Sequence, residues 1–117
     1  MTKFSGNIED KILLELKNIG FNLNLIGTTY IKEAISIINY SYDQENVSLD
    51  SKIYPKISKK YFKSEHNIKN SISYAINELY NMNNSKTIQK YFYLQDNSHA
   101  TPKIVIYSIL NKIKRNS

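Results

Sequence analysis

The sequence predicts an all-α protein, a compact helical domain of about five to six helices that contains a helix-turn-helix. Apolar residues recur at spacings of three and four through most of the chain, which is typical of amphipathic helices. Residues suited to helix N-caps precede several of these stretches. The length of 117 residues and the 41% hydrophobic content suit one domain with a buried core. We therefore expect residues 1–117 to form a single domain, with the helix-turn-helix at about 50–80.

The first helix is predicted over residues 8–19. Asn7 precedes it as an N-cap, and Gly20 follows it as a C-terminal stop. Residues 21–25 alternate between apolar and polar, which predicts a short extended connector. The apolar stripe of this first helix consists of Ile8, Ile12, Leu16 and Ile19.

The second helix is predicted to open at Gly27 and to end before the acidic stretch 43–46. A third helical segment is predicted over 49–61, and Pro55 lies inside it. Since proline disfavours a helix interior, either the first turn is irregular or the helix proper starts near Tyr54. The buried stripe of the second helix consists of Tyr30, Ile31, Ala34, Ile35 and Ile38, and that of the third segment of Leu49, Ile53, Ile57 and Tyr61.

Ser64 is a good N-cap for a fourth helix, which ends at Asn81-Met82-Asn83-Asn84. Residues 86–92 form a short helix or turn, and 94–100 read as a loop. Thr101-Pro102, an N-cap followed by proline at the first helical position, starts the last helix. The apolar stripes of these two longer helices are Ile68, Ile72, Ala75, Ile76 and Leu79, then Ile106, Ile109, Leu110 and Ile113.

Several classes of protein are disfavoured by composition. With no cysteine, the chain has neither a disulfide scaffold nor a zinc site of the finger type. His66 and His99 do not lie at metal-ligand spacing, and no nucleophile elbow or phosphate-binding glycine loop is present. We expect no catalytic residues, no metal and no cofactor, hence not an enzyme. Apolar runs are too short for a membrane span, and we expect a cytoplasmic protein.

The positive charge of the chain is concentrated in two segments. The formal net charge is +6, and residues 52–69 contribute +5, with six lysines against Glu65. Residues 103–117 contribute +4, whereas residues 1–51 carry −3. A local basic stretch attracts the phosphates of nucleic acids through counterion release. The alternative is a solvated, lysine-rich helix face without a nucleic-acid partner.

The segment 53–80 reads as two helices separated by the short link Phe62-Lys63. In a helix-turn-helix the second helix enters the major groove, with its N-terminal residues on base edges. We expect Lys59, Lys60, Lys63 and the Ser64 cap to hold phosphates. Candidates for contacts with base edges, on a recognition helix at about 65–80, are His66, Asn67, Lys69, Asn70, Ser73 and Tyr74. An ordinary helical hairpin with a lysine-rich surface would show the same spacing.

Two longer motifs resemble a known family. The first comprises Ile19-Gly20, Gly27 and Tyr30-Ile31-Lys32-Glu33-Ala34-Ile35, and the second Tyr54-Pro55-x-Ile57-x-Lys59-Lys60-Tyr61 followed by Ile68-x3-Ile72-x2-Ala75-Ile76. Over about residues 8–115 the chain resembles the C-terminal effector domain of the stage-zero sporulation master regulator of endospore-forming bacteria.

The resemblance implies an all-helical domain that binds double-stranded DNA and activates or represses transcription in sporulation. It implies head-to-tail pairs of molecules on repeated DNA sites, and hence a homodimer on DNA. It also implies RNA polymerase as a partner, through the segment near Asn81–Phe92.

Two departures from the family modify this expectation. If Met1 is the natural start, no phosphoacceptor receiver domain precedes the effector, and activity would follow the amount of protein or a partner. The family's recognition helix is arginine-rich, whereas here Asn67, Asn70 and Ser73 stand at the matching positions. Because asparagine pairs with adenine and arginine with guanine, we expect a more A·T-rich site. The alternative is a protein-interaction modulator or antagonist of a full-length regulator, with weak or no specific DNA binding.

Overall fold

The computed structural model describes residues 7–41 and 47–115 and confirms the all-α prediction, since these residues form helices and connecting segments without a strand. The expected acidic stretch at 43–46 lies outside the described residues. In chain order the elements are α1 (Ile8–Ile19), α2 (Ile26–Ser41), the π-helical turn η1 (Leu49–Ile53), α3 (Tyr54–Tyr61), α4 (Glu65–Met82), α5 (Ser85–Tyr91) and α6 (Pro102–Arg115).

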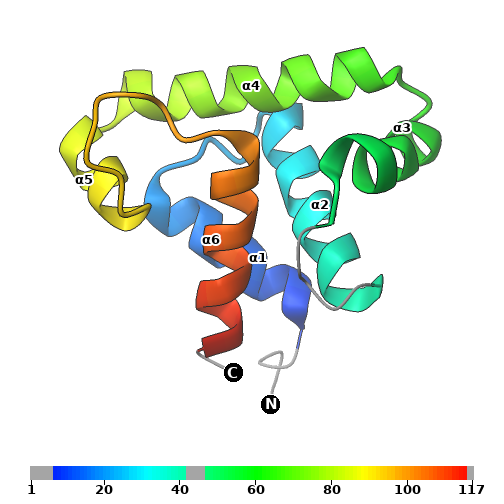
Figure 1. The fold of residues 1–117 in the computed structure, drawn as a ribbon, viewed down its shortest axis with the longest axis horizontal. Coiled ribbons are helices and arrows are strands. Elements are labelled where there is room, and N and C mark those ends of the chain that lie inside the picture. Colours follow the sequence, from blue (N-terminus) through cyan, green and yellow to red (C-terminus); the bar gives the residue numbers. More distant parts are fainter. Residues whose placement is uncertain (1–6, 42–46, 116–117) are drawn as a thin grey trace.

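The longest helix, α4, lies along one side of the molecule, and the other helices are arranged beneath and beside it (Figure 1). Helices α2 and α6 run away from α4, and α1 crosses behind them. Helix α3 lies at the N-terminal end of α4 and α5 at its C-terminal end. The C-terminal end of α6 is therefore on the side of the molecule opposite α4.

Side chains at the predicted caps determine where several helices begin. Asn7 Oδ1 accepts a hydrogen bond of 2.9 Å from the Glu9 amide, and Ser64 Oγ accepts one of 3.0 Å from the Asn67 amide. Thr101 Oγ1 accepts a bond of 3.2 Å from the Ile104 amide at the start of α6. These bonds satisfy amides that a helix leaves unpaired in its first turn, so the local cap signals are confirmed.

The connector at residues 21–25 is a turn, so the expected extended segment is wrong. Asn22 Oδ1 accepts from the Asn24 amide at 2.9 Å, and the Asn22 carbonyl accepts from the Leu25 amide at 3.2 Å. Asparagine side chains stabilise turns in this way, and here they override the apolar alternation. As a result Leu23 is 40% exposed, whereas Phe21 is buried.

Both structural alternatives for residues 49–61 occur together. The first turn, η1, is irregular, because the Tyr54 amide donates to the Leu49 carbonyl, five residues back. The regular helix α3 then starts at Tyr54, with Pro55 in its first turn, where the missing N–H of proline has no helical partner to lose. Ile53 and Ile57 are buried, and Leu49 and Tyr61 are partly buried against the core.

The core is a single cluster of apolar side chains from all six α-helices and η1. The predicted stripes of α2 and α4 are buried throughout, and these two helices share the largest contact in the described fold. They approach closely at Gly27, where a Cβ atom would lie 1.9 Å from the Ser71 carbonyl oxygen and 3.0 Å from the Ala75 Cβ. Glycine is therefore required at this crossing because backbone occupies the space of any side chain.

We expect Gly27→Ala to lower the free energy of unfolding by about 1–3 kcal/mol, because the added methyl group forces α2 and α4 apart. Denaturant unfolding followed by circular dichroism measures this change. Tyr40→Ala, at a 70% exposed position of the same helix, is the control and should stay within about 0.5 kcal/mol of wild type. A Gly27→Ala protein as stable as wild type would show that the close approach is not a constraint.

Candidate nucleic-acid interface

A short turn joins α3 to α4 and defines their relative orientation. Phe62 ends α3 in the left-handed conformation, with φ 57° and ψ 43°. The Lys63 amide donates to the Ser58 carbonyl at 3.2 Å, and Ser58 Oγ donates to the Lys63 carbonyl. Ser64 then caps α4. The chain thus reverses between the two helices within residues 62–64, as the helix-turn-helix prediction requires.

The exposed side of α4 carries polar, mainly uncharged side chains. Its opposite side is buried through the predicted stripe and Tyr80. Every candidate residue named from the sequence is exposed: Lys59, Lys60, Lys63, Ser64, His66, Asn67, Lys69, Asn70, Ser73 and Tyr74. The first half of α4 therefore presents a continuous polar surface that no other described element covers.

Four of the base-edge candidates gather in one area. An open groove is lined by His66, Asn67, Asn70 and Tyr74 together with Leu25, in the turn before α2, and Ile26, the first residue of α2. Asn70 Nδ2 lies 3.0 Å from His66 Nε2, within hydrogen-bond distance. The two side chains lie one helical turn apart on the exposed side of α4.

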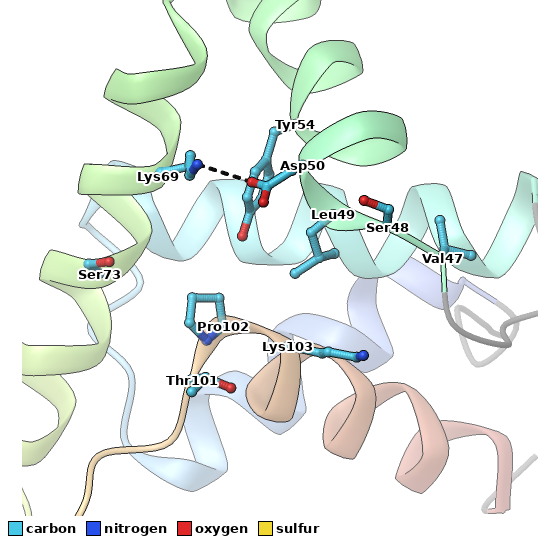
Figure 2. Close-up of a pocket in the computed structure, with 10 residues that line it drawn as sticks. All are labelled: Val47, Ser48, Leu49, Asp50, Tyr54, Lys69, Ser73, Thr101, Pro102 and Lys103. Carbon is cyan, nitrogen blue, oxygen red and sulfur yellow. Dashed lines mark ion pairs between the residues drawn. The ribbon is translucent and has the colours of Figure 1, made fainter.

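The other two base-edge candidates lie on a different flank of α4. Lys69 Nζ is 3.1 Å from Asp50 Oδ1 of η1. Lys69, Asp50 and Ser73 line a second open pocket, which the start of α6 completes with Thr101, Pro102 and Lys103 (Figure 2). No local sequence pattern links positions 69 and 101, so the position of the α6 N-terminus beside these residues could not be predicted.

The lysines of α3 and the turn differ in their partners. Lys60 Nζ lies 2.9 and 3.0 Å from the two carboxylate oxygens of Glu33 on α2. Lys59 and Lys63 make no ion pair with any residue in the described ranges 7–41 and 47–115. From the sequence we expected Lys60 to contact a DNA phosphate. The sequence did not identify Glu33, 27 positions earlier in the chain, as its partner.

Glu33 is a buried carboxylate, 8% exposed, that connects α2 to α3. Besides Lys60, the Tyr61 hydroxyl donates to its Oε2 at 2.9 Å, and Lys32 Nζ lies 3.7 Å away. Burial alone would raise the pKa of Glu33, but the hydrogen bonds from Lys60 and Tyr61 and the charges of Lys60 and Lys32 outweigh it and lower the pKa below 4.5. Burial and the bond to Glu33 raise the pKa of Tyr61 to about 12.

The C-terminal half of α4 is partly covered by the loop that precedes α6. The ring of His99 stacks on Tyr80, with centroids 3.9 Å apart, and His99 Nδ1 lies 3.1 Å from Asn77 Oδ1. The Ala100 amide donates to the Tyr80 hydroxyl at 2.9 Å. Asn77, which lies further along α4 than Asn67 and Asn70, is thus already engaged by this loop.

The described part of the chain contains neither a cluster of potential metal ligands nor a helix able to span a membrane. Its residues form no cluster of three or more histidine, cysteine, aspartate or glutamate side chains that could hold a metal ion. No helix within residues 7–41 and 47–115 is long and apolar enough to cross a bilayer.

The family model for the sporulation initiation factor Spo0A C terminal matches residues 12–113. This match includes both motifs that carry the resemblance and extends from α1 nearly to the end of α6. No curated protein matches the chain.

We expect Glu33→Gln to lower the free energy of unfolding at pH 7 by about 1–3 kcal/mol, because it weakens charge-assisted hydrogen bonds. The lowered pKa means that folded protein binds this proton more weakly than unfolded chain does. The stabilisation is therefore complete above the unfolded value of 4.5 and is lost as pH falls through the lower folded pKa.

Urea unfolding of wild type and variant between pH 7 and pH 3 tests this prediction, since the difference between them should narrow below about pH 4.5. Glu9→Gln is the control, because Glu9 is half exposed and lies 3.8 Å from Lys32. It should change stability by less than about 1 kcal/mol. A Glu33→Gln effect of the same size at every pH would contradict the proposed role of the charge.

Proposed function

Because the chain belongs to the family of Spo0A C-terminal domains, which are DNA-binding regulators of sporulation, we propose that it recognises specific double-stranded DNA sites and regulates transcription. The observation that carries the proposal is the uncovered polar side of the first half of α4, directly after the turn from α3. In this proposal α4 is the recognition helix and enters the major groove.

The dimensions and position of α4 suit that role. An α-helix of 18 residues is about 27 Å long, and a major groove of about 12 Å in width admits one helix. Helix α4 lies at the edge of the molecule rather than between other helices (Figure 1). Its N-terminal turns can therefore approach base edges without displacement of another described element.

We assign phosphate contacts first to Lys59 and Lys63, whose ammonium groups have no described acidic partner. The Ser64 cap and the first amides of α4 are further donors. Lys60 also faces this side, with a side chain that is 59% exposed, but its charge is largely neutralised by Glu33. We therefore propose a smaller phosphate contribution from Lys60 than from Lys59.

Base recognition is assigned mainly to His66, Asn67, Asn70 and Tyr74, which share one side of α4. Lys69 and Ser73 are proposed to contact bases or the adjacent strand from the other flank. Asparagine side chains form paired hydrogen bonds with adenine N6 and N7. This chemistry supports a preferred site that is richer in A·T than the guanine-containing sites read by arginine.

Further partners follow from the family and are also proposals. The segment Asn81–Phe92, which includes α5, is proposed to contact RNA polymerase, and two copies are proposed to bind repeated sites as a homodimer on DNA. Helix α5 lies at the end of α4 remote from α3, so a polymerase contact there would leave the recognition turns free (Figure 1). Such a regulator would act in the cytoplasm.

Selection of bound duplexes from a random double-stranded DNA pool tests the proposed function. Enrichment of one A·T-rich sequence supports it, and enrichment of a guanine-rich site would contradict the asparagine assignment. Recovery of no sequence from the pool would contradict specific recognition and favour a modulator that acts through protein contacts.

Replacement of a phosphate-binding lysine should weaken binding to all sequences equally. We expect Lys59→Ala to flatten the plot of log K against log salt concentration by about one unit. Lys114→Ala removes the same charge near the end of α6, on the side opposite α4, and should leave the slope unchanged (Figure 1). Fluorescence anisotropy titrations at four salt concentrations measure the slope, and equal slopes for wild type and Lys59→Ala would refute the assignment.

Replacement of Asn70 should instead relax the sequence preference at one position. We expect Asn70→Ala to lose about 1–3 kcal/mol of discrimination at a single adenine, with no change in salt slope. Asn81→Ala is the matched control. Asn81 lies near the C-terminal end of the same helix, beyond Asn77 and Tyr80, which His99 contacts. Competition with single-position DNA variants measures the effect, and unchanged discrimination at every position would exclude Asn70 from base reading.

A further inference from the structure

Phe62 combines an unfavourable backbone conformation with an exposed aromatic ring. Its φ of 57° lies in the left-handed region, which bulky residues rarely adopt and where glycine is usual at the end of a helix. Its side chain is 92% exposed, the largest value among the described large apolar residues. Neither backbone preference nor packing within the described fold accounts for phenylalanine at this position.

We propose that the Phe62 ring contacts DNA and helps to select thymine-containing sites, an inference that rests on the proposed function of α4. Phe62 directly precedes Lys63 and Ser64, so it lies at the end of α4 that would enter the major groove. The left-handed turn holds the ring outside the protein while the Lys63 amide stays bonded to the Ser58 carbonyl.

The chemistry of the ring limits what it can recognise. A phenyl group has no hydrogen-bond donor or strong acceptor, and the C5-methyl group of thymine is the apolar feature of base edges in the major groove. Contact with that methyl group would favour thymine at one or two positions. This preference agrees with the adenine contacts assigned to Asn70, because both residues then favour A·T base pairs.

A second residue of the chain supplies a matched control. Tyr93 lies two residues after the end of α5, has a φ of 58° and is 82% exposed. There the Leu94 amide donates to the Gln89 carbonyl at 2.8 Å, the same five-residue bond that Lys63 makes to Ser58. Helices α5 and α3 lie at opposite ends of α4, so Tyr93 shares the backbone feature of Phe62 without its position near the recognition turns (Figure 1).

The experiment compares Phe62→Gly with Tyr93→Gly. Because glycine adopts the left-handed conformation without steric cost, both variants should fold and show a Tm equal to or a few degrees above that of wild type. On the duplex enriched by the selection above, Phe62→Gly should bind about tenfold more weakly with an unchanged salt slope. Tyr93→Gly should bind as wild type does.

Replacement of each thymine in that duplex by deoxyuridine, which lacks the methyl group, tests the contact itself. Wild type should lose affinity at one or two positions, and Phe62→Gly should show no further loss at those positions. Equal affinity of Phe62→Gly and wild type, when wild type binds the duplex specifically, would overturn this inference alone. If deoxyuridine lowered the affinity of wild type and of Phe62→Gly by the same factor, the contact between the ring and the methyl group would be refuted. If wild type enriches no duplex, the proposed function fails and the inference fails with it.

Discussion

The crossing of α2 and α4 at Gly27 is the constraint on which the arrangement of the other helices depends. Because the Ser71 carbonyl occupies the space of a side chain at position 27, the two helices lie nearly backbone to backbone there. The same α2 helix, two turns later, holds α3 through the carboxylate of Glu33. Helix α2 thus holds both helices of the helix-turn-helix. It holds α4 through the close packing at Gly27 and α3 through the charged hydrogen bonds of Glu33.

These two attachments differ in what they contribute. Close packing at Gly27 is insensitive to pH and salt, and it fixes how near α4 lies to the body of the protein. The Glu33 interaction fixes the rotation of α3, because a buried carboxylate tolerates only geometries that satisfy its oxygens. It also neutralises one positive charge of the basic segment 52–69. The net charge of that segment is therefore larger than the charge available to interact with a phosphate backbone.

Local signals in the sequence were sufficient for the helices and their caps but not for contacts between helices. Asn7, Ser64 and Thr101 act on amides two or three residues away, and the apolar stripes follow helical periodicity, so these features could be predicted. The turn at 21–25 was misjudged because asparagine hydrogen bonds outweighed apolar alternation. Lys60 with Glu33, and Asn77 with His99, join positions 27 and 22 residues apart, and only the packed fold brings them together. The left-handed Phe62 could not be foreseen, since no glycine marks it.

In the DNA complex proposed above, the loop anchored by His99 would limit how many bases one molecule can read. With Asn77 engaged and the ring of Tyr80 covered, the uncovered length of α4 runs from Glu65 to about Ile76. Twelve helical residues span about 18 Å, which corresponds to roughly five base pairs of B-form DNA. Five positions recur by chance throughout any bacterial chromosome. With α4 as the proposed recognition helix, discrimination at the scale of a genome would require two molecules on adjacent sites, and the short uncovered length of α4 therefore supports the proposed pairing on DNA.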